Sequence, residues 1–106
     1  MQDGVPLLGE RVAIFGQGIV GLLTAALLAY FPLERLVTID RYPRRRQAAL
    51  DVGAHASLDA ERTDMAPILP GGADLTFELS GSPAALDAAI AATSFGGRIV
   101  VGSWYG

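Results

Sequence analysis

Residues 16–21 read GQGIVG and directly follow the apolar run RVAIF at residues 11–15. The next stretch, IVGLLTAALLAY at 19–30, is rich in alanine and leucine and predicts a helix. The three glycines therefore stand between a strand and a helix, although glycine weakens both kinds of element. This position indicates either a turn that is merely rich in glycine or a place where another molecule approaches the backbone closely.

Outward from this turn, the chain alternates between strand and helix patterns. Further strands are predicted at 36–39, 55–58, 75–79 and 99–101, helices at 43–52 and 83–94, and one or two helical turns within 59–68. Pro43 and Pro83 suit first helical positions, Ser82 suits a cap, and the pair at 96–97 suits a helix end. This order predicts βαβ units in an α/β fold: a doubly wound parallel sheet (Rossmann fold) of about five strands in order 3-2-1-4-5, with helices on both faces.

The composition excludes several classes of protein. The chain has 106 residues, 51% of them hydrophobic, which is enough for one domain. No apolar run reaches the roughly 18 residues of a membrane helix, and the first residues lack a secretion signal. The absence of cysteine excludes disulfides and thiolate metal sites and is consistent with a cytoplasmic protein. The net charge of −3 argues against a nucleic-acid surface.

The glycine turn meets the requirements of a dinucleotide fold. Gly16 would allow the tight turn after the strand, Gly18 would let a pyrophosphate reach the backbone, and Gly21 would let the helix lie close to the sheet. The phosphates would then meet the first N–H groups of the helix, including those of Ile19 and Val20. The alternative is a glycine-rich turn without a ligand.

A carboxylate about 20 residues further on is the second requirement of such a site. Asp40 ends the predicted strand LVTID and can accept hydrogen bonds from both hydroxyls of the adenosine ribose. Its charge would repel the 2′-phosphate of NADP, so this residue favours NAD. The alternative is an ordinary aspartate in a turn after a strand.

Four arginines follow Asp40 at positions 41, 44, 45 and 46. Cations at the start of a helix oppose its dipole, so the cluster is unfavourable unless something compensates it. A cofactor is one such partner, because arginine can stack on adenine or bind a phosphate. The alternative is a solvated arginine-rich turn, and Arg41 is the residue that could shift the preference to NADP.

Three long segments resemble the cofactor domain of the zinc-dependent medium-chain alcohol and polyol dehydrogenases. They read GERVAIFGQGIVGLLTAALLA at 9–29, LVTIDRYPRRRQAALDVGAHASLD at 36–59 and GADLTFELSGSPAALDAAIAATSFGGRIVVGSW at 72–104. The shared features are the glycine turn, the acid after the second strand, the VGAH after the second helix, and a strand that ends in Ser-Gly before an alanine-rich helix.

The resemblance implies further cofactor contacts. It places one group beside the nicotinamide: Leu79, Ser80 and Gly81. It implies that a backbone segment meets the carboxamide: Val101, Gly102 and Ser103. It also implies that Arg45 lies near the adenosine ribose.

The chain departs from the family in what it lacks. It has one histidine, His55, and no cysteine, so no catalytic residue and no zinc ligand can be named. Glu78 lies inside a predicted strand and forms no acid pair. We therefore expect residues 1–106 to form one dinucleotide-binding domain, a fragment whose catalytic domain is missing. The resemblance implies a parent oxidoreductase that transfers hydride from an alcohol to the nicotinamide while zinc polarises the alcohol oxygen.

Two other classes of protein share parts of this pattern. A stand-alone nucleotide-sensing module would have the same glycine turn and acid, although residues 74–103 fit it poorly. A methyltransferase that uses S-adenosylmethionine also has glycines after its first strand, but it usually lacks one at the place of Gly21. If strand 99–101 is the last of the sheet, its apolar edge predicts a homo-oligomer.

Overall fold

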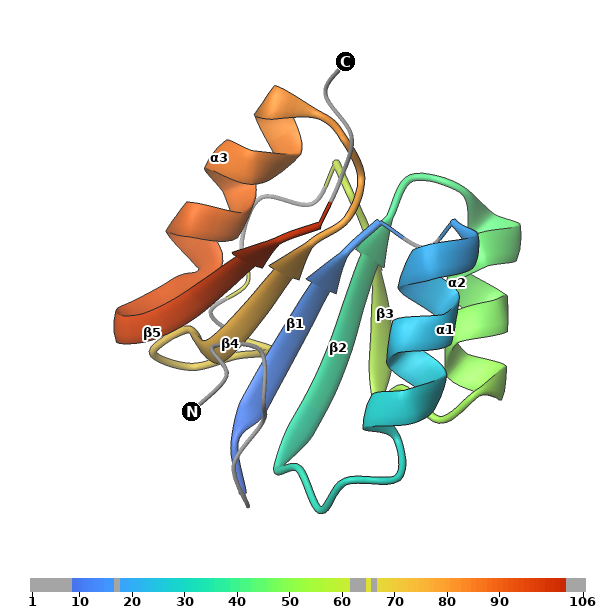
Figure 1. The fold of residues 1–106 in the computed structure, drawn as a ribbon, viewed down its shortest axis with the longest axis horizontal. Coiled ribbons are helices and arrows are strands. Elements are labelled where there is room, and N and C mark those ends of the chain that lie inside the picture. The colour runs from blue at the N-terminus through green and yellow to red at the C-terminus, as the bar shows by residue number, and fades with distance from the viewer. Residues whose placement is uncertain (1–8, 17, 62–64, 66, 103–106) are drawn as a thin grey trace.

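The computed structural model describes residues 9–16, 18–61, 65 and 67–102 of the chain. These residues form a parallel sheet with three helices (Figure 1). The elements are β1 (Arg11–Phe15), α1 (Ile19–Leu28), β2 (Arg35–Asp40), α2 (Pro43–Asp51), β3 (Ala56–Asp59), β4 (Ala73–Glu78), α3 (Pro83–Ala92) and β5 (Thr93–Val101). The strand order is β3-β2-β1-β4-β5, so the predicted doubly wound fold is confirmed.

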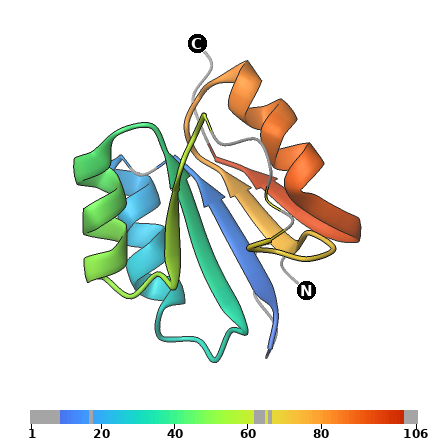
Figure 2. The same cartoon turned by 180° about the vertical axis from the view of Figure 1, so that it is seen from behind.

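The helices cover both faces of the sheet. Helices α1 and α2 lie together on one face and α3 lies on the other, as the views from the front and from behind show (Figures 1 and 2). Side chains of β1 alternate between these faces: Val12 and Ile14 pack towards α1 and α2, whereas Ala13 and Phe15 pack on the side of α3. Both faces are covered, so β1 is apolar after Arg11, and the inner strands β2 and β4 also bury the polar residues Thr38 and Thr76.

The last strand differs most from the prediction. Helix α3 was predicted to continue to position 94, but it ends at Ala92 and β5 begins at Thr93. Ala73 pairs with Thr93 and Leu75 already pairs with Arg98, so residues 94–97 form an irregularity in the strand. Glycine is required within this irregularity, because a Cβ on residue 97 would lie 2.7 Å from the Thr93 side chain. The pair at 96–97 thus lies within β5 rather than at a helix end.

Two smaller differences concern the first helix and the crossover from β3 to β4. Helix α1 ends at Leu28, two residues before the predicted end. The described part of 59–68 contains turns and no helix, so the predicted helical turns are not found there; residues 62–64 and 66 lie outside the described residues. The short strand predicted at 55–58 is confirmed as β3.

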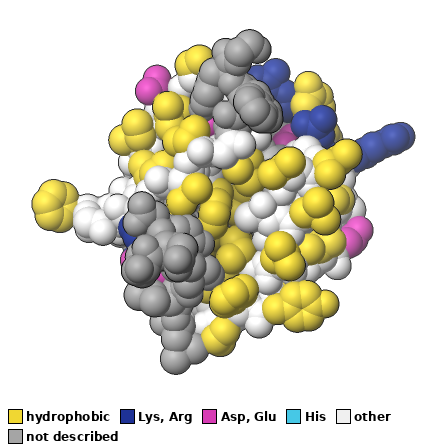
Figure 3. All heavy atoms as spheres, viewed as in Figure 1, with side chains coloured by type: hydrophobic (Ala, Val, Ile, Leu, Met, Phe, Trp, Pro, Cys, Tyr) yellow, Lys and Arg dark blue, Asp and Glu magenta, His cyan; other side chains and the backbone are white. Residues whose placement is uncertain are grey.

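The outer face of α1 is apolar and exposed. The exposed apolar side chains on or just after this helix are those of Ile19, Val20, Leu23, Leu27, Tyr30 and Phe31. Apolar side chains accordingly gather over this helix in the space-filling view (Figure 3). None of the helices in the described ranges has the length and apolarity needed to cross a membrane.

Ion pairs connect β1 and the residue before it with β4 and β5 at the amino end of the sheet. Arg98 of β5 pairs with Glu10, which precedes β1, at 2.6 Å between Nη2 and Oε1. Arg11 Nε lies 3.5 Å from Asp74 Oδ2, and the Arg11 backbone N–H donates to the same oxygen at 2.8 Å. These contacts join residues far apart in the sequence.

Candidate functional site

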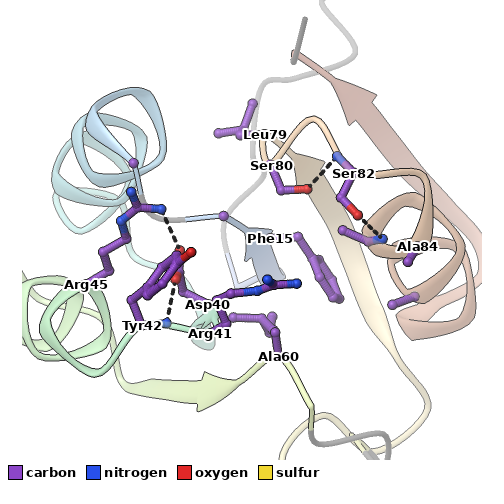
Figure 4. Close-up of a pocket in the computed structure, with 15 residues that line it drawn as sticks. Phe15, Asp40, Arg41, Tyr42, Arg45, Ala60, Leu79, Ser80, Ser82 and Ala84 are labelled. Atoms are coloured by element: carbon purple, nitrogen blue, oxygen red, sulfur yellow. Dashed lines mark hydrogen bonds and ion pairs between the residues drawn. The ribbon is translucent and has the colours of Figure 1, made fainter. Parts of the chain in front are cut away.

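A cavity of about 540 Å³ opens at the carboxyl ends of β1, β2 and β4 (Figure 4). It is lined by Phe15, Gly16, Gly18, Ile39, Asp40, Arg41, Tyr42, Arg45, Ala60, Leu79, Ser80, Ser82, Ala84, Ala85 and Ala88. After β3 the chain crosses to the other side of β1, so the strand order reverses at this cavity. Ligands of open α/β sheets bind at such a reversal.

Positions 16 and 18 are both glycine, but for different structural reasons. Gly16 has a φ of +97°, and a Cβ there would lie 2.9 Å from the backbone N and Cα of Ser80. This position needs glycine for the fold itself. Gly18 has a φ of −65°, which any residue adopts, and a Cβ there would meet no atom within 4 Å. The fold therefore tolerates a side chain at Gly18, and the open space beside it belongs to the cavity.

The amino end of α1 adjoins this open space. Gly18 is the N-cap, no side chain caps the helix, and its first turn holds no acidic residue. The first N–H groups of a helix have no partner within the helix, and with the helix dipole they form a favourable site for an anion. The end of α1 at the cavity therefore suits a phosphate group.

Asp40 lies on the opposite wall, at the end of β2. It is only 5% exposed, and its Oδ1 accepts a hydrogen bond from the backbone N–H of Tyr42 at 2.9 Å. Arg45 Nη1 lies 3.9 Å from its Oδ2. A buried carboxylate is costly unless it is paired and hydrogen-bonded, and these partners offset that cost. A carboxylate is thus fixed at the cavity wall.

Two of the arginines after Asp40, Arg45 and Arg46, have partners within the chain. The Arg45 guanidinium lies over the Tyr42 ring, 4.7 Å from its centroid, in a cation–π contact. Arg46 donates to the backbone carbonyl of Asp40 at 3.0 Å and lies 3.8 Å from the Asp59 carboxylate. These contacts compensate part of the charge at the start of α2. Arg41 extends into the cavity (Figure 4).

The loop between β4 and α3 forms the remaining wall. Ser80 and Ser82 line it, and the Ser82 backbone N–H donates to Ser80 Oγ at 3.1 Å. Ser82 Oγ then accepts from the Ala85 N–H at 3.3 Å, so Ser82 caps α3 as predicted. Asp40, Tyr42 and Arg45 lie on one side of the cavity, and this loop lies on the other (Figure 4).

Residues 20–105 match the family model described as zinc-binding dehydrogenase. The chain belongs to the zinc-binding dehydrogenase family. The resemblance drawn from the glycine turn, Asp40 and the segment at 72–104 is thereby confirmed.

Named relatives in this family act on several alcohols. Sorbitol dehydrogenase 1 of Saccharomyces cerevisiae is 35% identical over 103 residues, which cover 87% of this chain and 29% of that protein. The crystal structure of 2R,3R-butanediol dehydrogenase from Bacillus subtilis has 32% identity and a TM-score of 0.83, and the match covers 92% of this chain and 29% of that one. This chain thus spans less than a third of the length of these relatives.

A third relative was solved with a cofactor. It is a zinc-binding dehydrogenase from Sinorhizobium meliloti 1021 bound to NADP, with 29% identity and a TM-score of 0.81. The match covers 89% of this chain and 30% of that one.

The residues that the structure describes do not form a zinc site. The sequence has no cysteine, and the described residues contain no cluster of three His, Asp or Glu side chains that could hold a metal. The single histidine is engaged in the sheet, because His55 Nδ1 accepts a hydrogen bond from the Leu36 N–H at 2.8 Å. No step of chemistry by zinc can therefore be assigned to these side chains.

The cavity brings together half of the residues predicted to bind a cofactor. Those that line it are Gly16, Gly18, Asp40, Arg41, Arg45, Leu79 and Ser80. Those that do not line it are Ile19, Val20, Gly21, Gly81, Val101 and Gly102. The side chains of Ile19 and Val20 are exposed to solvent. The phosphate contact predicted for these two residues therefore involves their backbone N–H groups alone. Ser103 lies outside the described residues.

Other lining residues were not predicted. They are Phe15, Ile39, Tyr42, Ala60, Ser82, Ala84, Ala85 and Ala88. The three alanines of α3 are spaced at i, i+1 and i+4, which puts them on one side of a helix, and this small-residue pattern was the available signal. Ser82 was identified only as a helix cap, and its position beside the cavity depends on the contact between β4 and β1.

Proposed function

We propose that this chain binds NAD(H) at the carboxyl ends of β1, β2 and β4, as the cofactor domain of an alcohol or polyol dehydrogenase. One observation carries the proposal: the open space at Gly18 and the buried carboxylate of Asp40 belong to the same cavity. The first suits a phosphate at the end of α1, and the second suits a ribose. The volume of about 540 Å³ lies within the range of small-molecule sites.

Different residues of the site would contact different parts of the dinucleotide. The N–H groups at the start of α1 would donate to the pyrophosphate, and the Asp40 carboxylate would accept from the hydroxyls of the adenosine ribose. The alanines of α3 present a small, apolar surface that suits the flat face of adenine. Leu79 and Ser80 would contact the nicotinamide half. When bound, the nicotinamide supplies the hydride-accepting carbon, and the residues of this chain bind and orient it.

The charges at the ribose end favour NAD over NADP. A 2′-phosphate would meet the Asp40 carboxylate, which is fixed by the Tyr42 N–H and cannot easily turn away. Arg45 already interacts with Asp40 and with the Tyr42 ring. NADP is the second candidate, because Arg41 lines the cavity and a relative from Sinorhizobium meliloti was solved with NADP.

The activity of the whole protein is proposed from its relatives. A chain of this family would oxidise a secondary alcohol or polyol, as the names sorbitol dehydrogenase and butanediol dehydrogenase indicate for two relatives. The zinc and the groups that hold the alcohol would come from the part of the relatives that this chain does not span. That catalytic part is therefore the proposed protein partner of this domain.

Calorimetric titration with NAD⁺, NADP⁺ and S-adenosylmethionine tests the proposal. We expect NAD⁺ to bind at least about ten-fold more tightly than NADP⁺, because like charges at Asp40 oppose the 2′-phosphate. S-adenosylmethionine should not bind, because it offers no pyrophosphate to the end of α1. Preferential binding of S-adenosylmethionine, or no binding of either dinucleotide, would contradict the proposal.

A further inference from the structure

Glu78 is a buried carboxylate that makes none of the proposed contacts with the cofactor. It is the last residue of β4, it is 0% exposed, and it does not line the cavity. Asp40 and Glu78 are the buried acidic residues of the described chain. A buried charge is retained only where hydrogen bonds or opposite charges compensate it. The partners of Glu78 therefore indicate its role.

Those partners form a chain of hydrogen bonds that leads from the sheet to the cavity. Glu78 Oε2 accepts from the Ser80 backbone N–H at 2.8 Å and also from the Ser80 hydroxyl. Ser80 Oγ in turn accepts from the Ser82 N–H at 3.1 Å, and Ser82 Oγ accepts from the Ala85 N–H at 3.3 Å. The outer links of this chain lie at the edge of the cavity (Figure 4). Hydrogen bonds to a charged acceptor are stronger than those between neutral groups.

The same loop is held from the other side by the glycine turn. The backbones of Gly16 and Ser80 lie so close together that a Cβ on Gly16 would be 2.9 Å from Ser80 N and Cα, so the glycine turn packs directly against the loop. The hydrogen bonds to Glu78 prevent the loop from moving away. The Leu79 N–H also donates to the Phe15 carbonyl at 2.9 Å, which anchors the loop at its start. The width of the cavity between the turn and the loop is thus determined at Ser80.

We infer that Glu78 is a positioning residue for the nucleotide site. Its carboxylate holds Ser80 and Ser82 in place, and these two residues with α3 form the wall that faces Asp40 across the cavity. The inference rests on the proposed function for the identity of the ligand. The geometry of the loop does not depend on that ligand.

Binding of NADH and of AMP to three variants tests the inference, with a matched control. Glu78→Ala removes the acceptor and should raise both dissociation constants by about ten-fold or more, the value of a hydrogen bond to a charged group. Glu78→Gln keeps an acceptor oxygen and should stay within about three-fold of the parent. Ser80→Ala removes the middle of the chain and should weaken AMP binding by about three- to ten-fold; AMP is the readout for this variant, because Ser80 itself is proposed to contact the nicotinamide half of NADH. It also provides the test if Glu78→Ala does not fold.

Thr76→Val is the control. Thr76 lies two residues earlier on β4, is fully buried, and bonds to the Thr93 hydroxyl at 2.8 Å without lining the cavity. It should lower the melting temperature while leaving both dissociation constants unchanged, which separates a loss of stability from a loss of positioning. Affinity within two-fold of the parent in Glu78→Ala, or in Ser80→Ala if the former is unfolded, would overturn the inference.

Amide hydrogen exchange separates this inference from the proposed function. The Ser80 and Ser82 N–H groups should exchange at least about ten-fold faster in Glu78→Ala than in the parent, without any ligand present. Ser80→Ala should accelerate the exchange of the Ser82 N–H. If the parent binds no nucleotide, the proposed function fails, and these exchange rates still decide whether Glu78 positions the loop. Unchanged rates in both variants would refute its positioning role.

Discussion

The two ends of the sheet use charged residues in different ways. At the amino end, Arg98 and Glu10 lie 2.6 Å apart, and Arg11 contacts Asp74, so positive and negative groups meet directly. At the carboxyl end, Asp40 accepts a hydrogen bond from the Tyr42 N–H, and Arg45 Nη1 lies 3.9 Å from its carboxylate beside an open cavity.

The glycines differ in a similar way. Gly16 is in contact with Ser80 and belongs to the packing of the sheet, whereas Gly18, two residues later, faces open space. A residue packed closely against its neighbours, such as Gly16, stabilises the fold. A residue that borders the cavity and has open space beside it, such as Gly18, is available to a ligand. The predictions below test this division, from the largest expected effect to the smallest.

Gly18→Val should have the largest effect on binding. Its side chain has room in the folded protein but would occupy the space proposed for the pyrophosphate. We expect the dissociation constant for NAD⁺ to rise by more than about 100-fold, with a melting temperature within about 2 °C of the parent. Calorimetric titration and thermal unfolding measure the two quantities. Gly18→Ala should give a smaller loss, and binding equal to that of the parent in both variants would remove Gly18 from the site.

Gly16→Ala should chiefly affect stability. The change forces a Cβ into a backbone conformation with φ of +97° and against the Ser80 backbone. We expect the free energy of unfolding to fall by about 2–3 kcal/mol, since strain and overpacking act together. Urea denaturation measures this loss. A Gly16→Ala variant as stable as the parent would show that the turn and the loop after β4 do not pack as closely as described.

Asp40→Ala should change the choice of cofactor. Without the carboxylate, the 2′-phosphate of NADP⁺ loses a repulsive neighbour, and Arg41 and Arg45 remain close to the cavity. The ratio of the NADP⁺ and NAD⁺ dissociation constants should shift towards NADP⁺ by about ten-fold. Asp59→Ala is the matched control, because Asp59 pairs in register with Asp40 at the end of β3 but does not line the cavity. A shift of equal size in both variants would contradict the role of Asp40.

The outer edge of β5 is a candidate surface for self-association of the chain. Ile99, Val100 and Val101, the last three residues of β5, follow Arg98 and form an apolar segment at the edge of the described sheet. We propose that the chain self-associates through this segment, because an apolar edge without a lysine or proline recruits another strand. Val100→Lys should weaken self-association by several-fold in sedimentation at increasing concentration.

Leu23→Glu places a charge on the exposed face of α1 instead and serves as the second variant. Loss of association in this variant alone would move the contact from β5 to α1. A monomeric parent at high concentration would refute self-association.

Arg98→Gln should have the smallest effect. It removes the ion pair with Glu10, in which both side chains are less than a quarter exposed, and should lower the free energy of unfolding by about 1 kcal/mol. The dissociation constant for NAD⁺ should not change, because Arg98 lies at the end of the sheet opposite the cavity. A loss of affinity without a loss of stability would show that the two ends are not independent.

Most of the fold followed from local patterns. Apolar runs, prolines at helix starts and the glycine turn predicted the order of the elements, and the doubly wound fold that this order indicates gave the order of the strands. Asp40 was found because its distance from the glycine turn is set by one strand and one helix. The irregularity of β5 was missed, because it depends on the pairing of Ala73 with Thr93 across the sheet.

The sequence by itself therefore determined the fold class, the glycine turn and the acid after β2, all of which depend on short-range spacing. Only the tertiary structure decided that Gly16 packs on Ser80 while Gly18 faces a cavity. It likewise decided that Glu78 is buried and holds the loop after β4. These features depend on which parallel strands become neighbours at their carboxyl ends, and that juxtaposition of residues more than 60 positions apart leaves no local pattern in the chain.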